Sequence, residues 1–322
     1  LLFKQNHYNY VINNIFKNFN ISYSLVPQGF FVDSYAIRKI SYHFNVPNFM
    51  IENTFLNDRI IVEPTDSEYF IGKNLHSISE NNLYDKKLKK DNIFNLINEH
   101  LKRPKSDQHK SLGKESFDEV SDYVLFLAQV YTDASLLFNQ CEYSKNSVNL
   151  VCDIISISKS LKKKVIIKLH PKEYRGVDPV TFKPYRNLSF QKLLKAGILE
   201  NQQEGIFIDY DDRWSTFDLI RNSTLALTIN SQSGFEAMLL GKELIICANS
   251  YYSGLNSCIK ITNKASLATA MKSVLFDGYK ANDQSECWHF FDYIRDNYFL
   301  KKHPTNIFSN IDRRLKENFY NI

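Results

Sequence analysis

Polar side chains follow each continuous apolar run in the second half of this 322-residue chain. Continuous apolar runs are typical of parallel strands that are buried on both faces. Ligands bind beyond the carboxyl ends of such strands, so the side chains found there are the candidates for chemistry. They fall in five segments, at residues 129–135, 170–173, 209–212, 230–236 and 249–252.

The segment from Ser231 to Glu236 is a Ser/Gly-rich turn that opens a predicted helix. The free N–H groups and the positive dipole end of a helix attract phosphate. Ser231 and Ser233 could add hydroxyl donors, and Gly234 would let a phosphate approach the backbone. An ordinary serine N-cap is the alternative for Ser231. No GxxxxGK[ST] motif occurs, which argues against hydrolysis of a nucleoside triphosphate.

His170 follows another apolar run, and Pro171 fixes the backbone after it. With Lys168 and Lys172 on either side, His170 could hold a phosphate and help a nucleotide leave. A purely structural role at the strand end is the alternative.

Asp133 lies just beyond the first strand of this half, four residues after Gln129. Its carboxylate could act as nucleophile, as base or as an N-cap, and the local sequence favours the cap. Glu52 ends a strand near the N-terminus and could face Asp133 across a cleft. Two carboxylates that meet in a cleft are the arrangement used in glycosyl chemistry. A surface acid at a strand end is the alternative for Glu52.

These candidates need an alternation of strands and helices to position them. Apolar patterning predicts strands at 21–26, 48–51, 123–128, 165–169, 206–208, 225–229 and 244–247. Helices are predicted at 8–19, 33–44, 93–101, 144–161, 190–196, 215–221, 234–240 and 266–274, with two more between 283 and 321. The alternation predicts α/β domains with parallel sheets.

We expect two α/β domains. The first covers 1–117, is incomplete and ends in a basic linker. The second covers 118–282, and helices at 283–322 follow it. The lysine-rich stretch at 84–117 is interpreted as a solvated linker, with a basic surface for an anionic acceptor or a membrane lipid as the alternative.

Composition narrows the function classes. Lys and Arg number 40 against 35 Asp and Glu, a net charge of +5 that suits an anionic ligand and falls short of a nucleic-acid binder. No apolar run approaches the length of a membrane span. The five cysteines include no CxxC pair, which argues against a zinc site or a disulfide framework and favours the cytoplasm. Asp209, Asp211 and Asp212 are expected to form a solvated turn rather than a metal site.

Three motifs taken together suggest a family. In order along the chain they are QVYTDAS at 129–135, KLHPK at 168–172 and SQSGFEAMLLGK at 231–242. With QGFFVDSY at 28–35 and IENTF at 51–55, this set resembles the capsule-polysaccharide-biosynthesis family. Within it, the set is most similar to the retaining β-Kdo glycosyltransferases, which transfer 3-deoxy-manno-octulosonic acid (Kdo) from CMP-Kdo. The resemblance extends over about residues 27–255.

The resemblance implies a GT-B architecture, in which two Rossmann-like domains face a cleft and the final helices return to the first domain. It also implies that Asp133 attacks the anomeric carbon, giving a glycosyl–aspartyl intermediate, and that Glu52 is the acid/base. The donor-binding residues would be Gln129, Lys168, His170, Lys172, Ser231, Ser233, Gly234 and Glu236. Glu236 would contact the ribose or the base.

The implied partners are a CMP-sugar donor and a saccharide or glycolipid acceptor of a bacterial surface polysaccharide (capsule, O-antigen or lipopolysaccharide). No metal, cofactor or nucleic acid is expected. The implied location is the cytoplasm, with peripheral contact at the inner membrane.

Two other functions fit the same residues. One is a GT-B transferase that uses CMP-sialic acid, a UDP-sugar or CDP-glycerol. The other is a non-catalytic subunit that binds a sugar nucleotide. A covalent intermediate on Asp133 would distinguish the β-Kdo transferase from a direct inverting transferase of CMP-sialic acid, which forms none. Binding without turnover that is unaffected by Asp133→Asn would support the non-catalytic subunit.

Overall fold

The computed structural model describes residues 2–27, 32–56, 58–64, 73–81, 122–137, 141, 143, 145–177, 183–184, 186–198, 205–302, 309 and 312. The predicted basic linker, the helix at 93–101, the domain boundary at 117 and the segment 28–31 lie outside these residues. No helix in the described part of the chain is long and apolar enough to cross a membrane. The chain forms two compact units, one made of Leu1–Leu75 with Phe291–Ile322 and the other of His76–Phe290.

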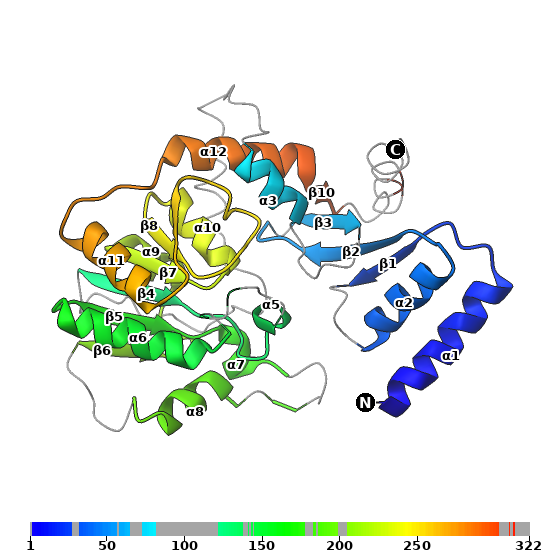
Figure 1. Cartoon of the computed structure of the whole chain (residues 1–322), viewed down its shortest axis with the longest axis horizontal. Helices are drawn as coiled ribbons and strands as arrows, with labels where there is room; N and C mark the ends of the chain where they lie inside the picture. Colours follow the sequence, from blue (N-terminus) through cyan, green and yellow to red (C-terminus); the bar gives the residue numbers. More distant parts are fainter. Residues whose placement is uncertain are drawn as a thin grey trace. The chain divides into compact units, whose positions relative to one another are not determined.

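The first unit has a mixed four-stranded sheet in the order β1-β2-β3-β10. β1 and β2 are parallel, whereas β3 and β10 each run antiparallel to their neighbour. The strands are β1 (Ser24–Pro27), β2 (Asn48–Asn53), β3 (Arg59–Pro64) and β10 (Leu300–Lys301). Helices α1 (Leu2–Asn18) and α2 (Val32–His43) pack on each other through Ile12, Ala36 and Ile40 (Figure 1).

The second unit has a parallel six-stranded sheet in the order β6-β5-β4-β7-β8-β9. The chain moves outward from β4 to β6, then crosses back to β7 and moves outward on the other side. This is the strand order of dinucleotide-binding domains, with its switch point between β4 and β7. The strands are β4 (Tyr123–Leu127), β5 (Lys164–Lys168), β6 (Ile206–Asp209), β7 (Leu225–Thr228), β8 (Glu243–Ile246) and β9 (Cys258–Lys260).

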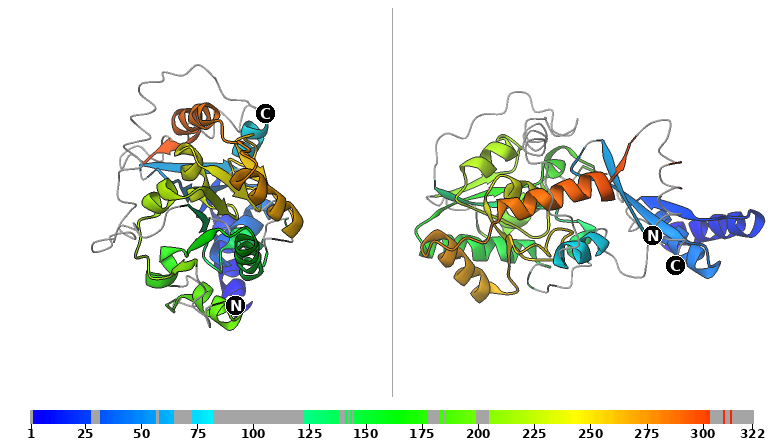
Figure 2. Two further views of the ribbon diagram at one scale, coloured as in Figure 1. Left: turned by 90° about the vertical axis from the view of Figure 1, so that its left-hand side faces the viewer. Right: turned by 90° about the horizontal axis from the view of Figure 1, so that it is seen from above.

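Helices cover both faces of this sheet (Figures 1 and 2). α6 and α11 pack on one face, and α9 and α10 pack on the other. The helices of this unit are α5 (Ala134–Leu137), α6 (Ser147–Ser160), α7 (Pro171–Arg175), α8 (Leu188–Lys195), α9 (Thr216–Asn222), α10 (Gln232–Leu239) and α11 (Lys264–Leu275). α3 (Lys73–Glu80) and α12 (Gln284–Tyr293, followed by the π-helical turn η3, Ile294–Tyr298) each cross a boundary between the units.

The strands and helices predicted between residues 122 and 275 are confirmed, with ends that shift by a few residues. Burial in the core explains why the apolar pattern of these elements could be read from the sequence. Side chains that alternate along the strands, such as Val124, Phe126, Val165 and Ile167, are fully buried against α6 and α11. Continuous burial on both faces produces the unbroken apolar runs.

The last turn of α3 docks on the loop after β8. A Cβ on Gly254 would lie 2.2 Å from the backbone nitrogen of Glu80, so the position must be glycine. The Gly254 amide donates to Ser79 Oγ at 3.1 Å. His76 Nδ1 lies 3.2 Å from Ser253 Oγ in the same contact. This contact fixes the start of the second unit.

The His76 contact should make the second unit sensitive to acid. Burial lowers the pKa of His76 below its ordinary value of 6.5, outweighing the attraction of Glu80. The unfolded chain therefore takes up this proton before the folded chain does, and stability falls as the pH drops below about 6.5. We expect His76→Gln to flatten this fall, measured as urea midpoints at about pH 8 and about pH 5. His7→Gln, at an exposed position on α1, is the control. Equal acid sensitivity in His76→Gln and the parent chain would contradict the account.

Candidate functional site

The loops after β4 and β7 meet at the switch point of the sheet. Gln129 Nε2 donates to Ser135 Oγ at 3.0 Å, and Gln129 Oε1 accepts from the Asn230 amide at 3.4 Å. Ser135 Oγ in turn lies 3.4 Å from Asn230 Oδ1. Asn230 Nδ2 donates to the carbonyl of Asn249, which follows β8. The expectation that polar strand ends gather at one edge is therefore met for these three strands.

Asp133 stands in the first of these loops, directly before α5. Its Oδ1 accepts the Ser135 amide at 2.9 Å, so the carboxylate caps this short helix as the local sequence suggested. Among the described residues, Oδ2 has no hydrogen-bond partner, and the side chain is half-buried. The cap fixes the orientation of the carboxylate and leaves one oxygen for a ligand.

Ser231 begins α10 next to Asn230 and is its N-cap. Its Oγ accepts the Ser233 amide at 3.3 Å, and its own amide donates to Thr228 Oγ1. The buried hydroxyl of Tyr252 donates to the Ser231 carbonyl at 2.6 Å and fixes the turn from the interior of the protein. The amino end of α10 therefore lies beside the Asp133 loop, where a helix dipole favours an anion.

The reason given above for Gly234 needs correction. A Cβ at this position would lie 2.4 Å from the Tyr252 hydroxyl and 2.8 Å from Thr228 Cγ2. The absence of a side chain at Gly234 therefore allows α10 to approach the sheet. The position that a Cβ would occupy faces the protein interior rather than a phosphate. Glu236, two residues further, is fully buried, and its charge adds to the burial that raises the pKa of Tyr251. Its contact with a ribose or base stays a prediction.

His170 is the N-cap of α7. Its Nδ1 accepts the Lys172 amide at 3.1 Å, and Pro171 occupies the first helical position. With Nδ1 as an acceptor, the neutral ring carries its proton on Nε2, which is then a donor. Lys172 is exposed at the same strand exit. Both residues remain candidates for holding phosphate oxygens.

Glu173 is a residue whose role the sequence did not reveal. Its carboxylate is 1% exposed and accepts the Tyr131 amide at 2.5 Å, the Ser189 amide at 2.7 Å and the Ser189 hydroxyl at 2.8 Å. It thereby ties the helix after His170 to the loop that carries Asp133. An acid two residues after the HP dipeptide was the available signal, but its partners lie 42 and 16 residues away along the chain.

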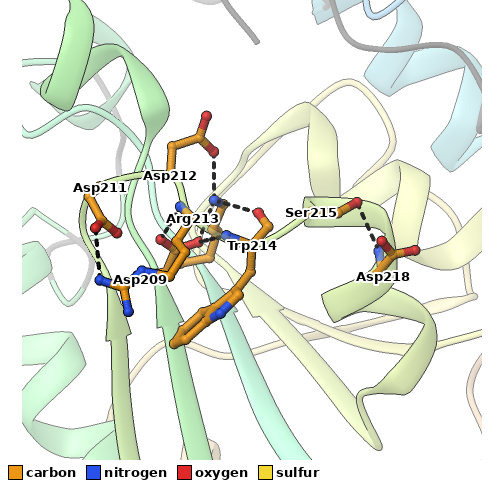
Figure 3. A network of polar contacts seen from close by, with 8 residues as sticks. Asp209, Asp211, Asp212, Arg213, Trp214, Ser215 and Asp218 are labelled. Carbon is orange, nitrogen blue, oxygen red and sulfur yellow. Dashed lines mark hydrogen bonds and ion pairs between the residues drawn. The ribbon is translucent and has the colours of Figure 1, made fainter. Parts of the chain in front are cut away.

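Lys168 is engaged inside the protein, which corrects its assignment to the donor. Its ammonium donates to Asp209 at 2.6 Å, to Asp212 at 2.7 Å and to the Trp214 carbonyl at 3.0 Å (Figure 3). These three acceptors use its three N–H groups. Asp209 and Asp212 are buried rather than part of a solvated turn, so that expectation was wrong. Asp212 adopts a left-handed backbone conformation (φ 58°) to reach the lysine.

Glu52 lies on β2 of the first unit, opposite Ile61 of β3, and is half-buried. Its pairing with Asp133 of the second unit stays a prediction. Arg59, on β3 of the same unit, is buried, donates to the Phe299 carbonyl and lies 3.5 Å from Asp296. Across the described residues, no three His, Cys, Asp or Glu side chains form a group that could hold a metal ion.

Comparisons with known proteins identify the family and the fold. A family model described as "Capsule polysaccharide biosynthesis protein" matches residues 72–277. No curated protein sequence matches the chain significantly. The β-Kdo 2,4 transferase KpsC of Thermosulfurimonas dismutans is similar in structure, with a TM-score of 0.53 and 15% identity over 90% of this chain and 86% of that one. This likeness confirms the expected α/β fold class of the GT-B type.

Two further solved structures are similar at lower scores. The β-Kdo 2,7 transferase of the same T. dismutans protein has a TM-score of 0.49 and 16% identity, covering 87% of this chain and 78% of that one. The UDP-GlcNAc 2-epimerase of Methanocaldococcus jannaschii has a TM-score of 0.46 and 16% identity, covering 90% and 80%.

The buried Lys168 network gives a direct test of the corrected assignment. Lys168→Met leaves two buried carboxylates without their cation, and we expect a loss of about 3–5 kcal/mol in the free energy of unfolding by urea. Adding Asp212→Asn should recover part of the loss. Lys172→Met, an exposed lysine at the same strand exit, should change stability by no more than about 0.5 kcal/mol. If Lys168→Met instead kept its stability and lost affinity for CMP, Lys168 would be a phosphate ligand after all.

Proposed function

The chain belongs to the capsule polysaccharide biosynthesis family, and on this basis we propose that it is a retaining β-Kdo glycosyltransferase with CMP-Kdo as donor. Family membership and the likeness of its fold to a β-Kdo 2,4 transferase support the proposal. The acceptor is a saccharide or glycolipid of a bacterial surface polysaccharide. The enzyme works in the cytoplasm, with peripheral contact at the inner membrane.

The proposed reaction is a double displacement. Asp133 Oδ2 attacks the anomeric carbon of Kdo, the bond to the phosphate oxygen breaks, and CMP leaves with the electron pair. Nε2 of His170 and the amino end of α10 stabilise the charge that develops on the phosphate. An acceptor hydroxyl then attacks the anomeric carbon and releases the Asp133 carboxylate, while Glu52 takes the hydroxyl proton.

One observation carries the proposal. A half-buried carboxylate with a fixed orientation stands in a loop that contacts the residue before the N-cap of α10, at the switch point of a parallel sheet. The Gln129–Ser135–Asn230 contacts connect the two loops at distances of 3.0–3.4 Å. These contacts would hold the proposed nucleophile and the proposed anion-binding helix end in fixed positions, and such preorganisation lowers the barrier of group transfer.

A comparison of turnover with binding tests these roles. With CMP-Kdo as substrate, we expect Asp133→Asn to lower the rate of CMP release by about a thousandfold or more. Its affinity for CMP should stay within about twofold of the parent value, because the carboxylate is not needed to hold CMP. His170→Ala and Ser231→Ala should each weaken CMP binding by about tenfold.

Asp211→Asn is the matched control, because Asp211 pairs with Arg213 on a loop of the same edge and has no assigned role. Parent-like turnover in Asp133→Asn would remove Asp133 from the reaction. Release of nucleotide from CMP-sialic acid or a UDP-sugar, with none from CMP-Kdo, would show that CMP-Kdo is not the donor.

A further inference from the structure

A groove of about 780 Å³ lies between α1 and α2 of the first unit, outside the site described above. The two helices run side by side (Figure 1), and their apolar contacts at Ile12 and Ile40 lie between them. The side chains that define its chemistry are Asn9, Tyr10, Asn13, Lys39, Tyr42 and His43.

Aromatic rings and amides dominate this groove. Tyr10 is 69% exposed and Tyr42 is 87% exposed, which is unusual for rings that could pack into a core. Asn9 Oδ1 is buried and has no hydrogen-bond donor among the described residues. A buried acceptor without a donor costs free energy, which a rotation of the Asn9 amide toward a ligand hydroxyl in the groove would recover. Flat rings beside amides suit a ligand with apolar ring faces and hydroxyl edges, which is the chemistry of a saccharide.

The charge of the groove favours an acidic ligand. Lys39 and His43 both line it. The sequences of α1 and α2 together contain two lysines and one arginine besides Lys39, at positions 4, 17 and 38, against a single acid, Asp33. Carboxylates along a saccharide chain would find charge-assisted donors here.

The groove is separate from the predicted acid/base. The residues Lys39 to Asn45 immediately precede Asn48, where β2 begins. Glu52 lies near the other, carboxyl end of the same strand. The groove therefore lies toward the amino end of β2, and Glu52 lies toward its carboxyl end.

We propose that the α1–α2 groove binds an acidic saccharide chain, as a non-catalytic subsite of the first unit. Tyr10 and Tyr42 stack on sugar faces, Asn9 and Asn13 bond to hydroxyls, and Lys39 pairs with a carboxylate. A membrane surface is the competing partner, because Val11 and Ile15 of α1 and the adjacent Phe19 are exposed apolar side chains. None of these three lines the groove, whose lining is formed mainly by amides, tyrosines and basic side chains, so we assign the groove itself to a saccharide. The inference does not require Kdo transfer, because the binding needs no donor.

Affinity gel electrophoresis of the full chain tests the proposal. The gels contain colominic acid, polygalacturonate or hyaluronate as acidic polysaccharides, and dextran as the neutral one. We expect at least one acidic polysaccharide to retard the chain, and dextran to have no effect. Tyr10→Ala/Tyr42→Ala and Lys39→Gln should each weaken this binding by about tenfold.

Tyr279→Ala and Lys272→Gln are the matched controls, since both positions are exposed on the second unit. All four variants alter only exposed side chains and should leave the thermal midpoint unchanged. No retardation by any acidic polysaccharide, equal loss in groove and control variants, or binding confined to vesicles of phosphatidylglycerol and phosphatidylcholine would each overturn the proposal. The assay contains no CMP-Kdo, so its failure is distinct from a failure of the proposed transfer.

Discussion

Buried charge at the carboxyl edge of the six-stranded sheet is the constraint on which the second unit depends. Polar groups buried there need partners within the protein, because an unpaired one is costly. Glu173 meets this need by joining the Asp133 loop to the start of α8. Lys168, 3% exposed, does so by joining the end of β5 to the loop after β6. Each buried charge therefore links the exit of one strand to a segment from elsewhere and holds the loops in one arrangement.

Two sets of residues at this edge have different roles. One set holds the loops in place, and the other presents atoms to a ligand. Glu173, Lys168 and Tyr252 direct their polar groups inward, to partners 2.5–3.0 Å away. Asp133 keeps one carboxylate oxygen without a partner among the described residues, and the amino end of α10 lies beside the loop that carries it. Group transfer needs this division, because reacting groups gain from fixed positions only when neighbouring side chains hold them.

The fold was predictable where burial leaves a local trace. Strands buried on both faces gave unbroken apolar runs, and capping residues such as Ser231 and Ser215 marked helix starts. β10 is two residues long and pairs with β3 some 240 positions earlier, so no local pattern encodes it. For the site, residue types located the edge but not the direction of each side chain. A lysine at a strand exit looks the same whether it meets phosphate or two aspartates more than forty residues on.

The covalent step on Asp133 is the central claim, and the intact mass of the protein tests it most directly. The full chain is mixed with CMP-Kdo without acceptor, quenched rapidly in acid and weighed beside Asp133→Asn. The account predicts a gain of one Kdo residue on the parent chain, located on the peptide that contains Asp133, and no gain on the variant. A gain that persists in Asp133→Asn, or that maps to another residue, would contradict it.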